Sequence, residues 1–241
     1  SNMASMQKLA GLMRRAIEKY DMIQPGDRIA IGVSGGKDSL ALLVGMQQLR
    51  AYLGIPYEIV ALTLDPCFNG VQTDYSPIAQ LCERLGVEYI CKRTEIGLIV
   101  FDRRQETNPC SLCARMRRAC LCDEALAAGC NKIALGHHFD DAIETFIMNL
   151  FEEGRVASFQ PVTYLSRKQV TMIRPMVMAE ESLISAAAHG EGLPIVKSRC
   201  PVDGNTNRER TKEWIRQMDK EHRGFKKRLY GAMERGHVSG F

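Results

Sequence analysis

Apolar residues along the chain recur at two spacings, one typical of short buried strands and the other of helices. An apolar run from Arg28 to Val33 ends in two glycines, and the next segment, Ser39 to Leu53, carries apolar residues at helical spacing. The same order recurs, so we expect further strands at 57–64, 87–91, 132–135 and 172–174 and helices at 76–85, 111–128 and 140–151. Alternating strands and helices predict an α/β fold with a doubly wound, mostly parallel sheet and helices on both faces.

The segment after the last expected strand keeps the helical spacing. Helices are expected at 180–189, 211–218 and about 226–233, and the last two form a small helical C-terminal extension. Residues 154–169 are expected to be a flexible loop. The chain then divides into a main domain over residues 6–196 and a C-terminal segment over residues 197–241. Residues 1–5 are expected to be a disordered remnant of an expression vector, because Ser1 and Asn2 precede Met3.

The amino-acid composition argues against a disordered, a membrane-spanning or a disulfide-dependent protein. The 241 residues are 45% hydrophobic and 25% charged, which suits one sizeable core and excludes a disordered chain. No apolar run approaches the roughly 18 to 20 residues that cross a bilayer, so we expect no membrane partner. No signal segment follows Met3, and we expect a cytoplasmic protein. Nine cysteines is an odd number in a chain too long to depend on disulfides, so reduced thiols or metal ligands are expected.

Positive charge is concentrated in two blocks, although the whole chain carries only +4. Residues 103–118 contain five arginines against one acid, and residues 197–235 contain twelve lysines and arginines against six acids. Acids at helical spacing could pair with the second block, which would then be an ordinary solvated helix surface. The first block has almost no acids to pair with, and it indicates an anionic partner.

The turn Ser34-Gly35-Gly36-Lys37-Asp38-Ser39 follows a strand and opens a helix. Glycines let backbone N–H groups converge on an anion, the helix N-terminus adds partial positive charge, and Lys37 adds a full one. The turn matches neither the Walker A pattern nor G-x-G-x-x-G. It predicts a phosphate-binding turn, the alternative being an ordinary capped turn between a strand and a helix.

A second turn, from Gly136 to Asp141, also lies between a strand and a helix. Ligands of doubly wound sheets bind at the carboxyl ends of the strands, so this turn is expected beside the first. Asp140 and Asp141 could then hold a magnesium ion that bridges phosphates. Two alternatives remain: the aspartates could only cap the helix, and the adjacent histidines His137 and His138 could bind zinc.

Two cysteines, Cys110 and Cys113, lie three residues apart at the start of a helix, so their thiols can face one point. Cys120 and Cys122 do not complete a zinc site with them, because seven residues of helix span about 10 Å. A thioredoxin-like redox pair is an alternative for Cys110 and Cys113, and Cys200 is a remote partner. The remaining cysteines are expected to be small buried hydrophobic residues, at positions 67, 82, 91 and 130.

The first turn resembles the SGGxDS motif of the PP-loop ATP pyrophosphatases. With the strings PCSLCARMRR at 109–118, ALGHHFDD at 134–141 and Arg174-Pro175, the chain from about Met6 to Arg235 resembles the TtcA branch of that family, the tRNA 2-thiocytidine synthetases. The resemblance implies a PP-loop domain that uses ATP to adenylate the C2 oxygen of a tRNA base, which sulfur then replaces. It also implies that Cys110, Cys113 and Cys200 hold a [4Fe–4S] cluster with one iron lacking a protein ligand.

The expected roles follow from these motifs and the resemblance. The expected ATP-binding residues are Ser34, Gly35, Gly36, Lys37, Asp38, Ser39, Leu64, Gly136, His137 and Asp141. The expected catalytic residues are Lys37, Asp38, Asp141, Cys110 and Cys113. The expected cofactors are ATP, Mg²⁺ and the [4Fe–4S] cluster. The expected partners are tRNA, a cysteine desulfurase or other sulfide donor, and a second copy of the chain in a homodimer.

The expected nucleobase is a cytidine in the anticodon loop, because a base must leave its stack to reach a pocket at the strand ends. Cys200 precedes a proline, as in 2-thiouridine-forming relatives, but this chain lacks their terminal zinc-binding cysteine pairs. Three alternative functions remain: a 2-thiouridine-forming enzyme, a PP-loop ligase for a small metabolite, which would not need the basic blocks, and an ATP-binding thiol sensor. A persulfide on Cys110 or Cys113 is the alternative route for sulfur.

Overall fold

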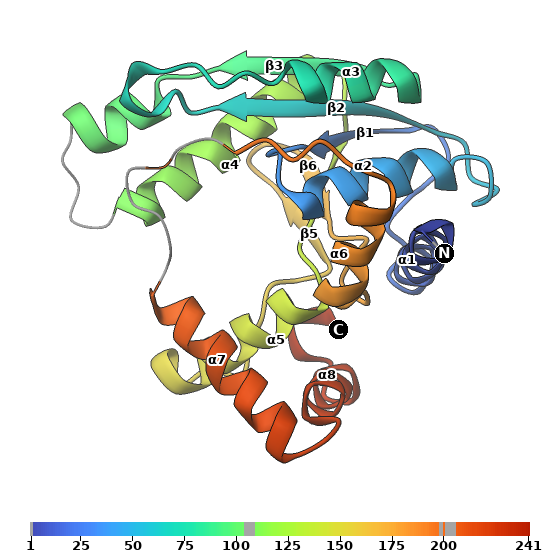
Figure 1. The fold of residues 1–241 in the computed structure, drawn as a ribbon, viewed down its shortest axis with the longest axis vertical. Helices are drawn as coiled ribbons and strands as arrows, with labels where there is room; N and C mark the ends of the chain where they lie inside the picture. The colour runs from blue at the N-terminus through green and yellow to red at the C-terminus, as the bar shows by residue number, and fades with distance from the viewer. Residues whose placement is uncertain (1, 104–108, 198–199, 201–205) are drawn as a thin grey trace.

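In the described part of the chain, six strands form one sheet in the order β3-β2-β1-β4-β6-β5 (Figure 1). The computed structural model describes residues 2–103, 109–197, 200 and 206–241. The strands are β1 (Asp27–Gly32), β2 (Tyr57–Asp65), β3 (Glu88–Arg93), β4 (Lys132–Ala134), β5 (Val162–Leu165) and β6 (Val170–Ile173). All neighbouring strands are parallel except β5, which runs antiparallel to β6 at the edge. The expected doubly wound, mostly parallel sheet is confirmed.

Helices cover both faces of this sheet (Figure 1). The helices of the main domain are α1 (Asn2–Lys19), α2 (Lys37–Leu49), α3 (Ser76–Leu85), α4 (Pro109–Ala127), α5 (Phe139–Met148) and α6 (Glu181–Gly190). Two further helices, α7 (Thr206–Glu221) and α8 (Phe225–Arg235), follow them. Shorter helical segments are η1 (Phe68–Gly70), η2 (Leu98–Arg103), η3 (Asn149–Glu153) and η4 (Val238–Gly240). None of the described helices is both long and apolar enough to span a membrane.

Successive side chains of β1 belong to two different hydrophobic clusters, one on each face of the sheet. Ile29 and Ile31 belong to the larger cluster, which includes residues of α1, α2, α3 and α6. Ala30 belongs to the smaller cluster, where Cys122 and Ala125 of α4 pack on the opposite face of the sheet. Because successive side chains of a strand point to opposite faces, each central strand is buried on both sides and reads as a continuous apolar run.

The C-terminal helices α7 and α8 pack on α5 and on each other, at the end of the molecule away from β3 (Figure 1). The expected helical C-terminal extension is therefore present, and α7 is longer than the sequence indicated. Its contacts with α5 matter for function, because α5 begins at the second of the two predicted binding turns.

Two expectations differ from the structure. The segment 154–169, expected to be a flexible loop, contains β5, whose residues Val162 to Leu165 pair with β6 through a tight connection. This strand has only four residues, and its pattern is visible only once β6 supplies the hydrogen-bonding partner. Residues 2–5, expected to be disordered, belong to α1, which is held on the domain by buried Met6, Leu9 and Met13.

Candidate nucleotide and thiol site

The first turn, between β1 and α2, is shaped by Gly35, whose backbone is left-handed with φ +102°. A Cβ at Gly35 would lie 2.2 Å from the carbonyl oxygen of Val196, so only glycine fits. The Val196 amide donates a 2.9 Å hydrogen bond to the Gly35 carbonyl, which anchors the turn to the segment after α6. The Gly36 N-cap has no side chain to occupy the first turn of α2. The start of α2 thus presents backbone N–H groups to an anion.

Gly136 brings the second turn against the first. A Cβ at Gly136 would lie 3.3 Å from the carbonyl carbon of Asp38, so a larger residue would push the turns apart. Buried His138 caps α5: its Nδ1 accepts a hydrogen bond from the Asp141 amide at 3.3 Å, and Asp141 accepts one from the His138 amide at 2.9 Å. The other ring nitrogen, Nε2, lies 3.6 Å from Asp38 Oδ2. His138 therefore fixes the relative positions of Asp38 and Asp141.

A cavity of about 560 Å³ opens where the two turns meet. The expected ATP-binding residues that line it are Ser34, Asp38, Ser39, Leu64, Gly136, His137 and Asp141. Gly35, Gly36 and Lys37 belong to the same turn but do not form its walls. The remaining walls are mostly apolar, with Leu62, Leu121, Leu135 and Met172 among them, and they also include two arginines. A polar rim with an apolar wall suits a nucleotide, whose phosphates and base have these opposite requirements.

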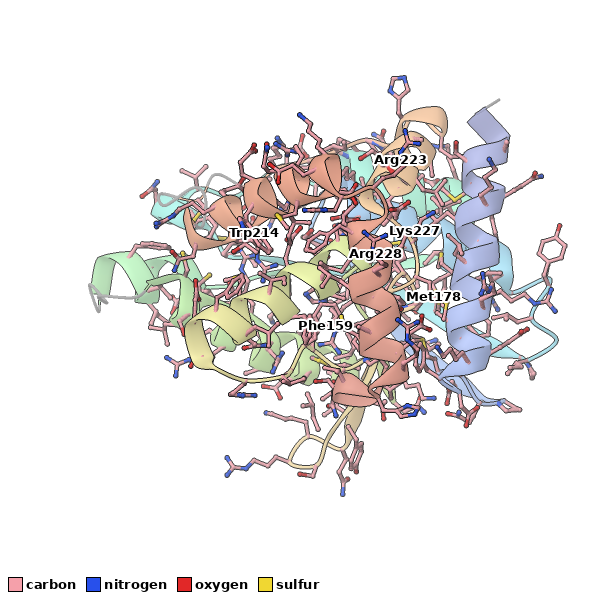
Figure 2. All side chains as sticks on the ribbon, turned by 90° about the horizontal axis from the view of Figure 1, so that it is seen from below. Phe159, Met178, Trp214, Arg223, Lys227 and Arg228 are labelled. Carbon is pink, nitrogen blue, oxygen red and sulfur yellow. The ribbon has the colours of Figure 1, made fainter. Side chains whose placement is uncertain are left out.

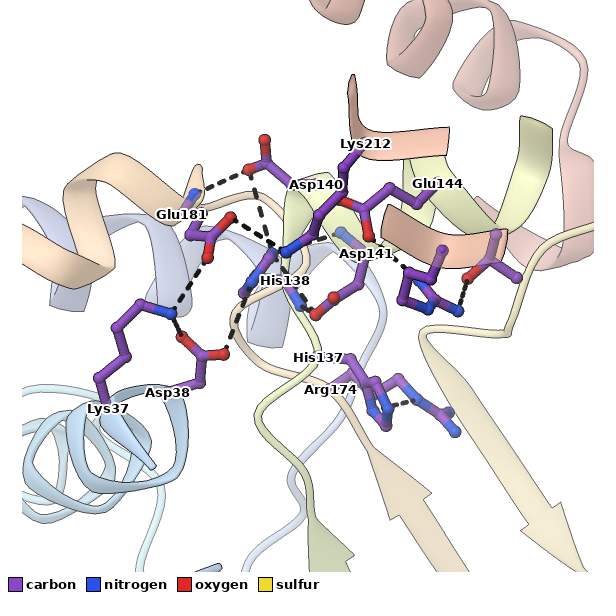
Figure 3. Close-up of polar contacts among 12 residues, drawn as sticks. Lys37, Asp38, His137, His138, Asp140, Asp141, Glu144, Arg174, Glu181 and Lys212 are labelled. Atoms are coloured by element: carbon purple, nitrogen blue, oxygen red, sulfur yellow. Dashed lines mark hydrogen bonds and ion pairs between the residues drawn. The ribbon is translucent and has the colours of Figure 1, made fainter. Parts of the chain in front are cut away.

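Lys37 is held by two carboxylates in the free protein (Figure 3). Its Nζ lies 3.0 Å from Asp38 Oδ1 and 3.2 Å from Glu181 Oε1. Burial by itself would lower the pKa of the Lys37 ammonium, but the two carboxylates outweigh it and raise the pKa. Lys212 of α7 lies 3.9 Å from the other oxygen of Glu181, so this carboxylate also links the turn to the C-terminal extension. No sequence pattern links Glu181 to Lys37, because the two residues lie 144 positions apart.

His137, which lines the cavity, and buried Arg174 form a second polar pair in this region (Figure 3). Arg174 Nε donates to His137 Nδ1 at 3.4 Å, and the same guanidinium donates to the Gln160 carbonyl at 2.6 Å. The protein atoms packed around the ring and the charge of Arg174 lower the pKa of His137. Burial, together with the charge of Arg118, lowers the pKa of Arg174 to about 10. His137 is therefore neutral near pH 7. It contacts Arg174, whereas His138 contacts Asp38 and Asp141, so the two histidines do not form a zinc pair.

Two arginines of the first basic block line the nucleotide cavity. Arg117 and Arg118, both on α4, border it beside Ala114, whereas Arg115 does not. The Arg117 guanidinium lies 5.5 Å from the centre of the Phe68 ring, and its Nε is buried without a hydrogen-bond partner among the described residues. From the sequence and the resemblance, these arginines are expected to contact tRNA phosphates and not ATP, and their position at the cavity differs from that expectation. Arg104, in the same block, lies outside the described residues. Helix α4 thus supplies cationic groups at the cavity itself.

The three expected cluster ligands are neighbours. Cys110 is exposed, while Cys113 and Cys200 are half-buried. Burial raises the pKa of the Cys113 thiol, the charges of Cys200 and Cys110 raise it further, and Arg117 opposes the rise. The described residues contain no group of three or more His, Cys, Asp or Glu side chains close enough to hold a single metal ion. Each thiolate of a cubane cluster binds a different iron, so a cluster needs the three sulfurs near one another but not converged on one point.

The other two cysteines of α4 occupy different surroundings. Cys122 is buried in the smaller core cluster, and the charges that act on Cys120 come from Glu124, Asp123 and Lys92. Among the cysteines expected to be buried, Cys82 and Cys130 are buried while Cys67 and Cys91 are half-buried. The helical spacing that separated Cys120 and Cys122 from the first pair agrees with this arrangement.

A charged pair connects α5 to α7 behind the cavity. Arg208 NH1 donates to Glu144 Oε1 at 3.1 Å, and the Glu144 side chain is only 4% exposed. Burial raises the pKa of Glu144 to about 7, although Lys212 and Arg208 oppose the rise. Lys226 of α8 lies 3.0 Å from Asp140 Oδ1, and Asp140 also accepts a 2.7 Å hydrogen bond from the Glu181 amide. The C-terminal extension is therefore joined to the second turn by ion pairs.

Comparison with known proteins places the chain among nucleotide-binding proteins. Residues 6–218 match the model of a PP-loop domain. A protein from Syntrophotalea carbinolica named tRNA-cytidine(32) 2-sulfurtransferase is 39% identical over 230 residues, which are 94% of this chain and 88% of that protein. A protein of the same name from Geobacter metallireducens is 36% identical over 229 residues, 94% of this chain and 89% of that protein.

The structure also resembles a solved structure over most of its length. The U34-tRNA thiolase NcsA from Methanococcus maripaludis, determined with its [4Fe–4S] cluster, superposes with a TM-score of 0.76 at 25% identity. The match covers 95% of this chain and 79% of that one. The similarity thus extends over the sheet, both turns and α4.

Proposed function

The chain belongs to the PP-loop family and, within it, to the tRNA-cytidine(32) 2-sulfurtransferases, and from this membership we propose that it uses ATP to replace the C2 oxygen of a tRNA cytidine by sulfur. The cytidine is position 32, in the anticodon loop. A protein that acts on tRNA works in the cytoplasm, and this is the location we propose.

One structural observation carries the proposal: helix α4 belongs to both halves of the site. Its first turn bears Cys110 and Cys113, with Cys200 beside them, and its next turns bear Arg117 and Arg118 at the nucleotide cavity. A thiol sensor or a small-molecule ligase has no need for thiols and nucleotide on one rigid element. A sulfur transfer does, because the sulfur must reach the carbon that ATP has activated.

The chemistry begins with activation of the base. The C2 carbonyl oxygen of cytosine attacks the α-phosphorus of ATP, the bond to the β-phosphate oxygen breaks, and pyrophosphate leaves. Sulfur then attacks C2, and AMP departs with the original oxygen. The N–H groups at the start of α2, Lys37 and the two arginines of α4 neutralise the charge that develops on the phosphates. Because Glu181 and Asp38 hold Lys37 in the free protein, ATP must compete with them for its ammonium.

Magnesium fits the carboxylates at the cavity. Asp38 and Asp141 both line it, and they offer the hard oxygen ligands that Mg²⁺ prefers. Mg²⁺ is commonly bound by one or two carboxylates together with substrate phosphates, so two aspartates suffice. Burial raises the pKa of Asp141, and a cation bound beside it would oppose this rise. Bound Mg²⁺ would supply charge neutralisation for the leaving pyrophosphate.

A [4Fe–4S] cluster fits the three thiols beside α4. Cys110 and Cys200 both act electrostatically on Cys113, and sulfur is the ligand that iron–sulfur clusters require. Such a cluster would supply an iron with an open coordination position. The alternative route, a persulfide on Cys110 or Cys113, uses the same residues without metal, and it predicts a colourless active protein.

The experiment measures nucleosides by mass spectrometry. Purified protein, reconstituted with iron and sulfide under anaerobic conditions, is incubated with ATP, Mg²⁺, sulfide and unmodified tRNA that carries cytidine at position 32. We expect 2-thiocytidine, AMP and pyrophosphate in equal amounts. A matched tRNA with uridine at position 32 should be thiolated far less.

Two results would contradict the proposal. Equal thiolation of both tRNAs, or thiolation of a uridine at position 34, would assign the enzyme to the 2-thiouridine-forming branch. AMP formation with a small metabolite and none with tRNA would favour a ligase. A brown protein with about four irons and four sulfides per chain would support the cluster, whereas an active colourless one would support the persulfide.

Two further parts of the proposal concern the source of the sulfur and the oligomeric state of the enzyme. We propose that a cysteine desulfurase or another sulfide source donates the sulfur, and that the enzyme is a homodimer. The dimer is tested by light scattering of the purified protein at micromolar concentration. A mass near 27.0 kDa, that of one chain, would contradict it.

A further inference from the structure

Two aromatic side chains are exposed side by side near the end of the molecule formed by α5 and α7. Phe151 of η3 is 68% exposed and Trp214 of α7 is 38% exposed. Their ring centroids lie 5.3 Å apart at 87°, an edge-to-face contact. In every other ring contact found in the described residues, at least one ring is buried or half-buried. Leaving two large aromatic rings in water is unfavourable, so a purpose for this pair has to be sought.

The pair is held rigidly. Trp214 contacts Phe225 of α8 edge to face at 5.8 Å, and the adjacent Ile215 is buried. Phe151 lies in η3, which continues α5, and the side chain of Asn149, two residues earlier, donates a 2.9 Å hydrogen bond to the Ala157 carbonyl. Rings fixed in this way lose little conformational entropy when a planar group stacks on them.

A slot of about 300 Å³ lies beside the two rings. Ile147 and Met148 form part of its wall, and its rim includes Arg210, Asn207 and Glu152. Arg210 NH2 donates to Asn207 Oδ1 at 3.2 Å, so these two rim groups are positioned together. The slot thus offers apolar and aromatic surface for a flat group, with donors and acceptors at its edge. Nucleobases have this combination of a π-face and a polar edge.

The surroundings of the pair carry more cations than acids. Residues 206–235 contain ten lysines and arginines against five acids. Two exposed acids lie next to the rings: Glu213, which pairs with Arg216, and Glu152 at the slot. Figure 2 shows Trp214 on the same face of the molecule as Arg223, Lys227 and Arg228. These three cations are exposed, as are Arg216 and Lys220 of α7. Cations around an aromatic surface attract the phosphates of a nucleic acid and repel a cationic peptide. Charge complementarity therefore favours a single-stranded nucleic acid as the occupant.

The pair also lies within reach of the active site. Helix α5 begins at the second binding turn, and Phe151 follows Asp141 by ten residues along α5 and η3. At about 1.5 Å per residue this is about 15 Å, a distance that a few unstacked nucleotides can span. A base stacked on the pair could therefore belong to the same loop as the base in the cavity.

We propose that Phe151 and Trp214 form a stacking platform for an unpaired base of the tRNA anticodon loop, a few nucleotides from the cytidine that enters the cavity. The inference rests on the proposed function, because it takes tRNA as the substrate. It adds a recognition surface for an unstacked loop outside the nucleotide cavity. A second copy of the chain is the competing occupant, and the experiments separate the two.

The first experiment uses the intrinsic fluorescence of Trp214, since the chain contains one tryptophan. The unmodified anticodon stem-loop RNA is titrated into the protein, and a fully paired duplex of equal length serves as the control. Stacking of a base on Trp214 should quench and shift its emission with the stem-loop and much less with the duplex. Equal quenching by both RNAs, or none while labelled stem-loop binds by anisotropy, would overturn the proposal.

The second experiment compares variants by anisotropy with the same labelled stem-loop. Phe151→Ala and Trp214→Ala should each raise the Kd by about 5-fold or more, the size expected for loss of one stacked base. Trp214→Phe, which keeps a ring, should restore most of the affinity. Tyr52→Ala is the matched control. Tyr52 is 70% exposed but follows the C-terminus of α2, at the other end of the strands from the binding turns. The Kd of this variant for the stem-loop should equal that of the wild type.

Folding and assembly are checked on the same samples. Phe151 is the more exposed ring, so its variant should keep the wild-type thermal transition even if Trp214→Ala loosens the contact with α8. An unchanged Kd for Phe151→Ala would overturn the platform. So would a halved molecular mass of Phe151→Ala by light scattering, because the rings would then face a second copy of the chain.

Failure of the platform is distinguishable from failure of the proposed function. Wild-type thiolation of cytidine 32 with an unchanged KM for tRNA in both variants would refute the platform and leave the function intact. Loop-specific quenching by a protein that thiolates no tRNA would support the platform and refute the function.

Discussion

The ammonium of Lys37 is positioned before any substrate arrives, by carboxylates from two different elements. Asp38 lies next to it in sequence, whereas Glu181 opens α6 and is itself fixed through its amide by Asp140. This arrangement keeps Lys37 charged and close to the N-terminus of α2. An ATP phosphate can take the place of Glu181 without a large movement of the lysine, because the two anions compete for the same donor.

Lys37→Ala or Asp38→Ala should lower the rate of AMP and pyrophosphate formation with tRNA at least about 100-fold, the loss typical of removing one group that stabilises developing charge. Both side chains are partly exposed at the edge of the sheet, so the fold should persist. The measurement is pyrophosphate release, with circular dichroism as the folding control. Full pyrophosphate release by both variants would exclude the first turn as the ATP site.

At the level of elements, α4 connects the thiols, the nucleotide cavity and the core. Its first turn carries the paired cysteines, its middle carries arginines on two sides, and Cys122 packs against the sheet. A helix is stiff over this length, so the spacing between the thiols and the cavity is fixed. The next two predictions concern the residues along this helix.

Cys110→Ser, Cys113→Ser and Cys200→Ser should each lose iron and thiolation activity, whereas Cys120→Ser should keep both. The reason is the surroundings of each thiol: Cys110 and Cys200 both act on Cys113, whereas the charges that act on Cys120 come from other residues. Iron and acid-labile sulfide are measured per chain after anaerobic reconstitution. If Cys120→Ser loses its iron and Cys200→Ser keeps it, the ligand set is wrong.

Arg115 and Arg118, which lie three residues apart on α4, provide the second test. Arg118 lines the cavity and Arg115 does not. Arg118→Ala should therefore raise the KM for ATP several-fold. Arg115→Ala should leave that KM unchanged while it weakens tRNA binding and reduces the salt slope by about one. ATP titrations and tRNA binding at several salt concentrations measure these effects; the reverse pattern would place tRNA on the cavity side of α4.

At the level of the whole molecule, the C-terminal extension is attached through ion pairs as well as apolar contacts. The ion pair between Arg208 and Glu144 joins α7 to α5, and the Glu144 carboxyl is almost fully buried. Burial raises its pKa from 4.5 to about 7, so the folded protein holds a proton that the unfolded chain has released in this range. Stability is therefore lost as the pH rises from about 4.5 through 7.

Glu144→Gln should remove this pH dependence. Relative to wild type, the variant should gain up to roughly 3 kcal/mol in the free energy of unfolding between pH 5 and pH 8, the equivalent of a shift of two to three pKa units. Urea denaturation at both pH values measures the gain, and Glu152→Gln, at an exposed position, is the control. A variant less stable than wild type at pH 8 would show instead that the ionised pair with Arg208 holds the extension.

The sequence by itself determined the alternating strands and helices, and with them the sheet and its ligand edge. Both binding turns were readable for the same reason: glycine, lysine and aspartate at fixed offsets after a strand act through local backbone geometry. Helical spacing also separated Cys120 and Cys122 from the first cysteine pair. These properties depend on neighbours within a few positions, which a sequence displays directly.

Other features were decided only by the tertiary structure. Glu181 meets Lys37, Arg208 meets Glu144, and Phe151 meets Trp214 across long stretches of chain. The four residues of β5 became a strand only because β6 lies beside them. Which side of α4 faces the cavity likewise depends on how the helix packs on the sheet. Contacts between distant positions are set by packing and burial, which local periodicity does not specify.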